Sequence, residues 1–277
     1  MFAAAHGGVG SKRELDEFVQ KALDRGVSEG ETALEVVIEA VIGLENDEHF
    51  NAGKGSRMRM DGSIQMDAAV MGGGEIGAVG AIEKVKNPVL VAREIYRSPF
   101  VMLVGTDATQ FARDVGYEEY DPVTEHRKEE LEGMREKLRI SGRKDKLQKL
   151  REFYEKVDGG DTVGCVAYKG GEFAAAVSTG GTSYCWRGRV GDSPMVGSGF
   201  FVGENGAVVA TGKGEAIIKK MASYKCHDYM GEYGVDEACK KVVEMFPDKV
   251  SIGLIAVDEE GYGVCSNKQM SQAVFED

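Results

Sequence analysis

Apolar positions in the first part of the chain recur at the spacing of an α-helix. Residues 13–25 form one such stretch, with Leu15, Phe18, Val19, Ala22 and Leu23 on one face. The sequence Ser-Glu-Gly-Glu at residues 28–31 fits a capping box, which predicts that a second helix begins there and runs to Leu44. Asn87 before Pro88 predicts another helix start, and residues 107–115 predict a further helix.

Short apolar runs broken by glycine dominate the second half of the chain and predict strands. The runs lie at residues 163–168, 173–179, 207–211 and 252–257, and a shorter one lies at residues 63–66. Residues 215–230 and 236–245 have helical spacing. Because strands and helices do not alternate strictly, we expect an α+β fold with antiparallel sheets and helices packed outside them.

The stretch from Thr124 to Lys156 interrupts this pattern, since Lys, Arg and Glu dominate it and its apolar stripe is thin. We expect a solvated, partly mobile helical linker there. It ends in the loop sequence Asp-Gly-Gly-Asp at residues 158–161.

Composition narrows the range of partners. The formal net charge is −12, which disfavours nucleic acid and anionic membranes, because both require clustered Lys and Arg. No apolar run approaches the ~20 residues that span a bilayer, and no signal-peptide core is visible. The five cysteines form no C-x-x-C pair and the four histidines no H-E-x-x-H motif. We therefore expect a cytoplasmic protein with reduced thiols, without a catalytic metal or other catalytic cofactor.

A glycine-rich junction at residues 211–215 invites comparison with a phosphate-binding loop. The spacing does not fit, because Ala207 stands where the first glycine belongs and Gly214 follows Lys213. A strand end with the Thr211 hydroxyl and exposed N–H groups at a helix start can instead hold an oxyanion. An ordinary turn is the alternative.

The turn-rich segment of residues 188–194 places Arg189 three positions before Asp192. Arg binds carboxylates with two parallel hydrogen bonds, and Asp pairs with an ammonium group. Together they suit the head group of an amino acid, although a surface ion pair fits these residues equally well.

Thr162 lies at a loop-to-strand boundary, and Thr179 lies at the end of the next predicted strand. A threonine hydroxyl is a weak nucleophile, and no His–Asp pair is visible to activate it. A free α-amine on the same residue can serve as the base, since its pKa of about 7.7–8.0 is close to neutral pH. Such an amine exists only if the chain is cut before Thr162.

Together these elements resemble the plant-type asparaginase family, also called isoaspartyl aminopeptidases/asparaginases, among the N-terminal-nucleophile hydrolases. The similarity covers nearly the whole chain except the charged linker, and archaeal members look most similar. The matching segments, in family order, are residues 6–10, 44–56, 66–71, 77–79, 86–88, 160–164, 178–181, 188–194 and 211–215. The resemblance implies one domain over residues 1–277 with a four-layer αββα sandwich. It also implies self-cleavage into an α subunit of residues 1–161, with the linker at about 124–161, and a β subunit of residues 162–277.

The resemblance also implies the function, hydrolysis of L-asparagine to L-aspartate and ammonia and of β-aspartyl dipeptides, and a role for each site residue. Cleavage occurs between Asp161 and Thr162, and Thr162 then acts as the nucleophile. The implied catalytic groups are Thr162, Thr179, Thr211 and Gly212, of which the last two form the oxyanion hole. Arg189 holds the substrate α-carboxylate and Asp192, with the Gly214 carbonyl, its α-amine, while Asn51 bonds near the nucleophile.

Two further implications concern a cation and assembly. The loop of residues 44–54 is similar to one that wraps a structural sodium ion with main-chain carbonyls. Its implied ligands are Leu44, Glu45, Asp47, Phe50, Ala52 and Lys54. The implied assembly is a homodimer of the precursor, or (αβ)2 after cleavage.

Three positions depart from the family pattern. Asp161 stands where many members have glycine and is typical of the glycosylasparaginase branch, Lys213 brings a cation near the oxyanion site, and residues 267–270 lack a threonine. Two alternatives stay open: a glycosylasparaginase that cleaves N-linked asparagine amides, and an uncleaved, inactive scaffold or amino-acid-binding protein.

Overall fold

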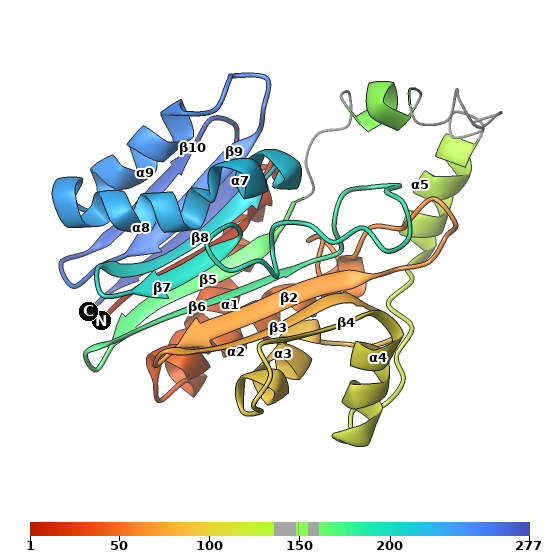
Figure 1. The fold of residues 1–277 in the computed structure, drawn as a ribbon, viewed down its shortest axis with the longest axis horizontal. Helices are drawn as coiled ribbons and strands as arrows, with labels where there is room; N and C mark the ends of the chain where they lie inside the picture. Colours follow the sequence, from red (N-terminus) through yellow and green to blue (C-terminus); the bar gives the residue numbers. More distant parts are fainter. Residues whose placement is uncertain (136–147, 149, 155–160) are drawn as a thin grey trace.

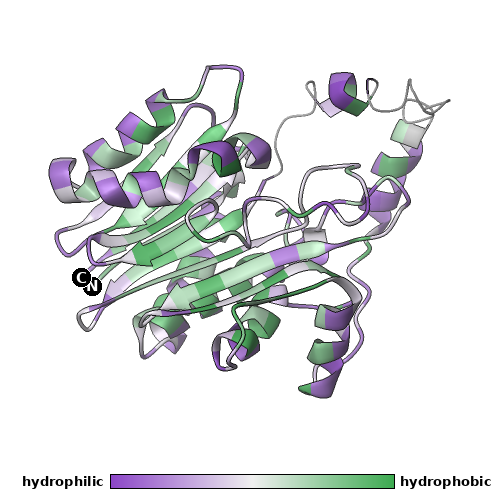
Figure 2. Cartoon of the chain, viewed as in Figure 1, coloured by the Kyte–Doolittle hydropathy of each residue, from purple (hydrophilic) through white to green (hydrophobic). Residues whose placement is uncertain are grey.

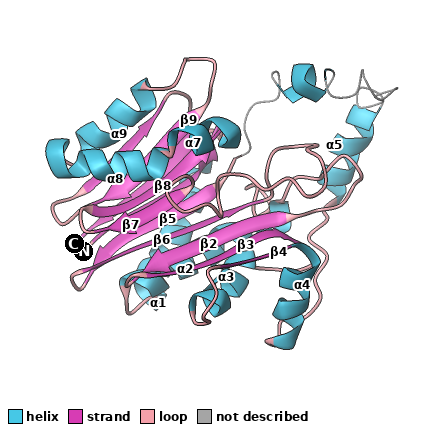
Figure 3. Ribbon diagram, viewed as in Figure 1, coloured by secondary structure: helices cyan, strands magenta, loops and turns pink. Residues whose placement is uncertain are grey.

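The computed structural model describes residues 1–135, 148, 150–154 and 161–277. These residues form an α+β fold with two β-sheets and helices on their outer sides (Figures 1 and 3). The seven-stranded sheet has the order β11-β1-β5-β6-β2-β3-β4 and is antiparallel except for the β3–β4 pair. Its strands are β1 (Phe2–Val9), β2 (Met66–Gly72), β3 (Glu75–Ile82), β4 (Met102–Val104), β5 (Val163–Lys169), β6 (Glu172–Thr179) and β11 (Met270–Glu276).

The four-stranded sheet is antiparallel throughout, with the order β10-β9-β8-β7. Its strands are β7 (Phe200–Gly203), β8 (Gly206–Gly212), β9 (Ile252–Val257) and β10 (Tyr262–Ser266). The described helices are α1 (Asp16–Glu29), α2 (Ala33–Glu45), α3 (Pro88–Tyr96), α4 (Gly105–Asp114), α5 (Glu125–Arg135), α7 (Gly214–Lys220), α8 (Ala222–Tyr233) and α9 (Val235–Glu244), with short 3-10 turns η1 (Arg13–Leu15) and η2 (Gly53–Gly55).

The central strands are apolar on both faces, which explains their position between helices and a second sheet. Along β1, Ala3 and Ala5 belong to the apolar cluster that also contains residues of α1, α2 and α3, whereas Ala4 belongs to the cluster between the two sheets. The outer face of the smaller sheet is covered by α8 and α9, whose apolar residues join Val208 and Ala210 of β8 in a third cluster. Figure 2 shows the apolar strands enclosed by helices with polar outer faces.

The two ends of the chain meet. β1 pairs with β11, and the Met1 amine donates a hydrogen bond of 2.6 Å to the Asp277 carbonyl. Figure 1 shows the N and C marks side by side.

The predicted capping box at residues 28–31 is wrong, because α1 continues to Glu29. Ser28 turns its hydroxyl back to the Arg25 carbonyl within that helix, at 3.1 Å. The capping box lies four residues later, where Thr32 accepts from the Glu35 N–H at 3.2 Å and the Glu35 carboxylate accepts from the Thr32 N–H at 3.1 Å.

Two other predicted elements are corrected. Residues 63–65 form no strand, and β2 begins only at Met66. The Asp61 carboxylate accepts from the Ser63 N–H at 3.0 Å and from its hydroxyl at 2.7 Å, which holds the start of this run against the preceding turn. The helix predicted for residues 215–230 is broken at Met221, whose φ of 50° and ψ of 54° are left-handed, so that α7 and α8 have different directions.

The predicted solvated linker is partly wrong. On α5, Arg127 and Leu131 are only 7% and 4% exposed. The Arg127 guanidinium donates to the Gly55 carbonyl at 3.0 Å, which docks the helix onto the core, while His126 on its other side is 73% exposed. Residues 136–147, 149 and 155–160 of this stretch lie outside the described residues. In the part of the chain that the structure describes, no helix is long and apolar enough to cross a membrane.

Candidate active site

Thr162 directly precedes β5, and the strand register places it at the same end of the sheet as Thr179. Val163 pairs with Ser178, so the next residue outward on each strand is a threonine. Both threonines are buried, with Thr162 only 4% exposed. The Thr162 Oγ1 lies 3.3 Å from the Ser193 Oγ, and the Thr179 hydroxyl accepts from the Gly181 N–H at 3.0 Å.

Asp161, the residue before Thr162, is held against the first strand. A Cβ placed on Gly8 would lie 2.6 Å from the Asp161 Cα, so only glycine permits this approach. The Asp161 carboxylate accepts from the Arg57 guanidinium at 3.2 Å. The chain is thereby fixed on both sides of the peptide bond before Thr162.

Thr211 and Gly212 lie at the end of β8, as predicted. The Thr211 hydroxyl accepts from the Val9 N–H at 3.3 Å, which leaves its own hydrogen available to donate elsewhere. Gly212 has a φ of +146°, and a Cβ on it would lie 2.2 Å from the Ser251 carbonyl oxygen. The Lys213 ammonium donates to the Tyr154 carbonyl at 3.2 Å, so the cation expected near this site has a main-chain partner.

Arg189, Asp192 and Gly214, the residues predicted to bind the substrate head group, lie close together. A Cβ on Gly214 would lie 2.5 Å from the Asp192 Oδ1 and 2.9 Å from an Arg189 guanidinium nitrogen. The Arg189 guanidinium donates twice to the Glu215 carboxylate, at 3.0 and 3.1 Å. Arg189 therefore does form an ion pair, which was the alternative interpretation of this segment, but its partner is Glu215 and not Asp192.

Burial raises the pKa of the Asp192 carboxyl to about 7, although the nearby Arg189 charge acts in the opposite direction. Asp192 is 4% exposed, and its Oδ2 has no hydrogen-bond partner among the described residues. A buried acceptor without a partner beside a guanidinium is suited to a ligand that brings its own donor.

Asn51 supports the turn that follows Thr179. Its amide donates to the Gly181 carbonyl at 2.9 Å, and its main-chain carbonyl accepts from the Gly180 N–H at 2.8 Å. Its side-chain oxygen accepts from the Arg57 N–H at 2.8 Å. Asn51 therefore holds the backbone near Thr162 and Thr179, with no direct contact of its side chain to Thr162 among its hydrogen bonds.

Sequence reasoning missed three residues of this region, namely Ser193, Asp67 and Arg57. Ser193 is fully buried and supplies the hydroxyl partner of Thr162. The buried Asp67 carboxylate accepts from the Gly191 N–H at 3.1 Å and from the Ala81 N–H at 2.7 Å, which fixes the loop of Arg189. Ser193 and Asp67 lie inside the segments that resemble the family, at residues 188–194 and 66–71. A polar residue next to an apolar run was the sequence signal that could have identified them. Arg57 had no local signal.

The loop of residues 44–55 folds tightly upon its own carbonyl groups. A Cβ on Gly53 would lie 2.4 Å from the Glu45 carbonyl oxygen, and one on Gly55 would lie 2.0 Å from the Phe50 oxygen. Main-chain oxygens are ligands of the type that sodium takes, so the loop offers donors of that kind. No cluster of three or more His, Cys, Asp or Glu side chains suited to a metal occurs among the described residues.

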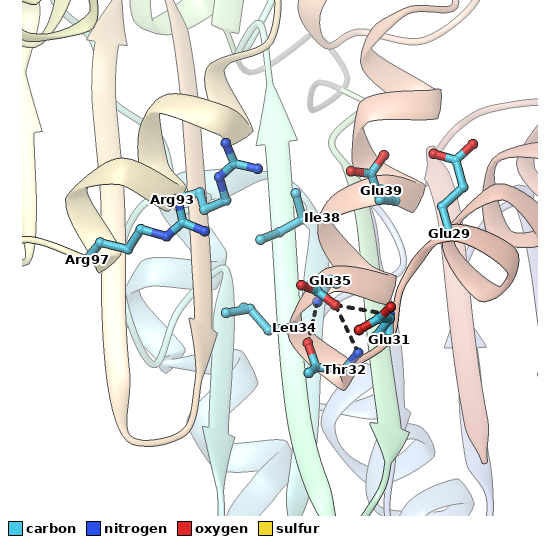
Figure 4. Close-up of a pocket in the computed structure, with 9 residues that line it drawn as sticks. All are labelled: Glu29, Glu31, Thr32, Leu34, Glu35, Ile38, Glu39, Arg93 and Arg97. Atoms are coloured by element: carbon cyan, nitrogen blue, oxygen red, sulfur yellow. Dashed lines mark hydrogen bonds between the residues drawn. The ribbon is translucent and has the colours of Figure 1, made fainter. Parts of the chain in front are cut away.

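A surface cavity of about 450 Å³ lies elsewhere, between the start of α2 and α3 (Figure 4). No predicted site residue lines it, and several of its charges are paired within the protein: Glu29 and Glu39 with Arg25, and Arg93 with Glu94. It carries no chemistry comparable to that around Thr162.

Comparison with known proteins identifies the family. Residues 4–277 match the asparaginase family Asparaginase_2. The chain is 38% identical to a plant-type L-asparaginase of Thermococcus kodakarensis, over 98% of this chain and 95% of that protein. It is also 38% identical to an isoaspartyl peptidase of Escherichia coli, over 93% of this chain and 87% of that protein. It is 36% identical to an isoaspartyl peptidase/L-asparaginase of Rattus norvegicus, over 91% of this chain and 77% of that protein. The chain therefore belongs to the asparaginase family.

Proposed function

We propose that this protein is a self-cleaving threonine hydrolase that converts L-asparagine to L-aspartate and ammonia and also hydrolyses β-aspartyl dipeptides. The observation that carries the proposal is the buried Thr162 hydroxyl beside Thr179 and Ser193, at a strand end where Arg189 and Asp192 also converge. Relatives named plant-type L-asparaginase and isoaspartyl peptidase support both activities.

Maturation begins when the Thr162 Oγ attacks the carbonyl carbon of Asp161. The bond from that carbon to the Thr162 nitrogen breaks, the nitrogen takes up the hydroxyl proton, and an ester links the two residues. Water then hydrolyses the ester and restores the hydroxyl. Residues 1–161 become the α subunit and residues 162–277 the β subunit, and together they form a single domain with a four-layer αββα sandwich.

Turnover uses the amine that cleavage has freed. The Thr162 amine takes the hydroxyl proton while the Oγ attacks the side-chain carbonyl of asparagine. The Thr211 hydroxyl and the Gly212 N–H stabilise the oxyanion, and Thr179 tunes the nucleophile. The carbon–nitrogen bond then breaks, the amine returns its proton to the departing ammonia, and water hydrolyses the β-aspartyl ester to aspartate.

Substrate orientation comes from the converging groups beside the nucleophile. Arg189 holds the α-carboxylate, and Asp192 holds the α-amine together with the Gly214 carbonyl. Asn51 keeps the turn after Thr179 in place. The loop of residues 44–54 binds a structural sodium ion through its carbonyls, and the assembly is a homodimer of the precursor or (αβ)2.

Intact mass spectrometry beside an ammonia-release assay on asparagine tests this function. Wild-type protein gives two fragments that meet between Asp161 and Thr162 and releases ammonia, whereas Thr162→Ala stays a single chain of 29.9 kDa and releases none. An intact, inactive chain in both samples would instead support the scaffold alternative. Cleavage of glycosylasparagine in preference to asparagine would place the protein with the glycosylasparaginases.

A further inference from the structure

The main chain around Arg189 is fixed by hydrogen bonds that do not involve its side chain. The Arg189 N–H donates to the Trp186 carbonyl at 3.0 Å, and the Gly191 N–H donates to the buried Asp67 carboxylate at 3.1 Å. An arginine side chain still has many rotamers when its backbone is held. The direction of the guanidinium therefore depends on a separate partner.

Glu215, the second residue of α7, is that partner. The Arg189 Nε and Nη2 both donate to the Glu215 Oε1, at 3.1 and 3.0 Å. No other group among the described residues accepts a hydrogen bond from this guanidinium. Partial burial acts to raise the pKa of the Glu215 carboxyl, but the Arg189 charge outweighs it and the pKa lies below its ordinary value. Glu215 is thus an ionised partner at neutral pH.

The opposite end of the guanidinium stays available. Glu215 uses two of the five N–H groups of Arg189, so those on Nη1 and one on Nη2 have no acceptor. A Cβ on Gly191 would lie 2.7 Å from Nη1, and one on Gly181 would lie 3.5 Å from it. The Gly181 N–H itself donates to the Thr179 hydroxyl. The open end of the guanidinium therefore faces the turn beside the proposed nucleophile.

Pairing with Glu215 also leaves Asp192 without the partner that its spacing from Arg189 suggests. Both side chains lie against Gly214, yet the Asp192 Oδ2 has no hydrogen-bond partner among the described residues. A guanidinium turned toward Asp192 would consume both charges of the head-group site. Glu215 thus keeps one positive and one negative group unpaired at the same time, which suits a zwitterion.

We propose that Glu215 is a positioning residue for substrate binding. It holds the Nε–Nη2 edge of Arg189, so that the other end stays open to the α-carboxylate and Asp192 stays open to the α-amine. The inference rests on the proposed function, in which Arg189 and Asp192 bind these two groups. Because Glu215 acts through Arg189, its loss should weaken binding and spare the chemical step.

The test uses Glu215→Ala and Glu215→Gln, with rates expressed per mole of cleaved chain measured by intact mass. Glu215→Ala is expected to raise KM for L-asparagine and the inhibition constant of L-aspartate about tenfold, as for loss of a hydrogen bond between charged groups. Its kcat should stay within about twofold of wild type. Glu215→Gln keeps an oxygen that can accept from Nε and Nη2, so it should restore most of the affinity.

A double-mutant cycle shows whether Glu215 acts through Arg189. In an Arg189→Ala background, adding Glu215→Ala is expected to change kcat/KM on asparagine less than about twofold, because the group that it positions is already absent. The same tenfold loss in both backgrounds would mean that Glu215 acts independently, which would overturn the inference.

The matched control is Asp61→Ala. Asp61 is a half-exposed carboxylate that pairs at 3.4 Å with Arg187, the other arginine of this segment, and its removal should leave KM and kcat at wild-type values. An unchanged KM in Glu215→Ala would overturn the inference, as would a fall in kcat alone. A lower KM would also overturn it, since Glu215 would then compete with the substrate for Arg189. Absence of Thr162-dependent asparagine hydrolysis by cleaved wild-type enzyme would overturn the proposed function itself.

Discussion

The Thr162 Oγ1 and the Ser193 Oγ lie 3.3 Å apart in a buried position, although the two residues are 31 positions apart in sequence. Ser193 immediately follows Asp192, so the loop that supplies the carboxylate proposed to bind the substrate also supplies a hydroxyl to Thr162, the proposed nucleophile.

Removing that hydroxyl should slow the chemical step without unfolding the protein. Ser193→Ala deletes a neutral hydrogen bond of about 0.5–1.5 kcal/mol, so kcat on asparagine is expected to fall about three- to tenfold. Ser223→Ala is the matched control, since Ser223 of α8 is equally buried but its hydroxyl donates to the Ser198 carbonyl. Steady-state kinetics on fully cleaved samples measure the effect, and an unchanged kcat would remove Ser193 from the mechanism.

Arg189→Ala should separate substrate binding from maturation. Its guanidinium bonds Glu215 and lies beside Asp192, and it has no contact with Asp161 among its hydrogen bonds. We expect kcat/KM on asparagine to fall about a hundredfold or more, as for truncation of a buried charged partner, while the fraction of cleaved chain stays near wild type. Arg187→Ala serves as a control in the same loop. Equal loss of cleavage and hydrolysis would contradict the role of Arg189 in holding the substrate carboxylate.

The raised pKa of Asp192, about 7, predicts a pH dependence of substrate affinity. Only the ionised carboxylate pairs with the substrate ammonium, so KM for asparagine should rise as the pH falls below 7. Asp192→Asn should bind substrate weakly and lose this dependence. A wild-type KM that stays constant from pH 5 to 8 would exclude Asp192 as the ammonium partner.

The same shift predicts an opposite effect on stability. The pKa of Asp192 in the folded protein exceeds the ordinary value of 3.8, so folding favours the protonated form and this group lowers stability as the pH rises from about 4 to 7. Thermal unfolding should therefore show Asp192→Asn to be more stable than wild type at pH 8 and similar at pH 4. A variant that is less stable at both values would show that the Arg189 charge outweighs desolvation.

Close contact between the sheets depends on Gly164 of β5. A Cβ there would lie 2.5 Å from the Val209 Cγ1 of the facing sheet, so Gly164→Ala is expected to cost about 1–3 kcal/mol of unfolding free energy. Gly133→Ala on α5 is the control, since no atom of the described residues lies within 4 Å of the added Cβ and alanine favours a helix. Urea unfolding measures the stability of both variants in the uncleaved Thr162→Ala protein. Equal stability of the two variants would mean that the sheets accommodate the added methyl group at residue 164 with no loss of unfolding free energy.

The residues proposed to carry the chemistry could be picked out from sequence, because each lies in a short segment of constrained type. Thr162, Arg189, Asp192 and Thr211 belong to such segments, and the fold brings them to one sheet end. Arg57 and Asp161 meet across 104 residues, and no local pattern encodes such a contact.

The fold was predicted less completely, for physical reasons. β1 is buried on both faces, so it lacks the alternation that marks a half-exposed strand. The helix break at Met221 was not predicted because neither glycine nor proline marks it. Met221 adopts its left-handed conformation as a non-glycine residue, which a sequence pattern does not indicate.

The meeting of Met1 and Asp277 means that the order of the two halves is not fixed by the fold. A short connector from residue 277 to residue 1, with a new start at Thr162, would give a circular permutant with the same strand neighbours. Once its initiator methionine is removed, such a chain is born with the threonine amine already free. Maturation and catalysis, which the natural connectivity makes sequential, would then be independent properties.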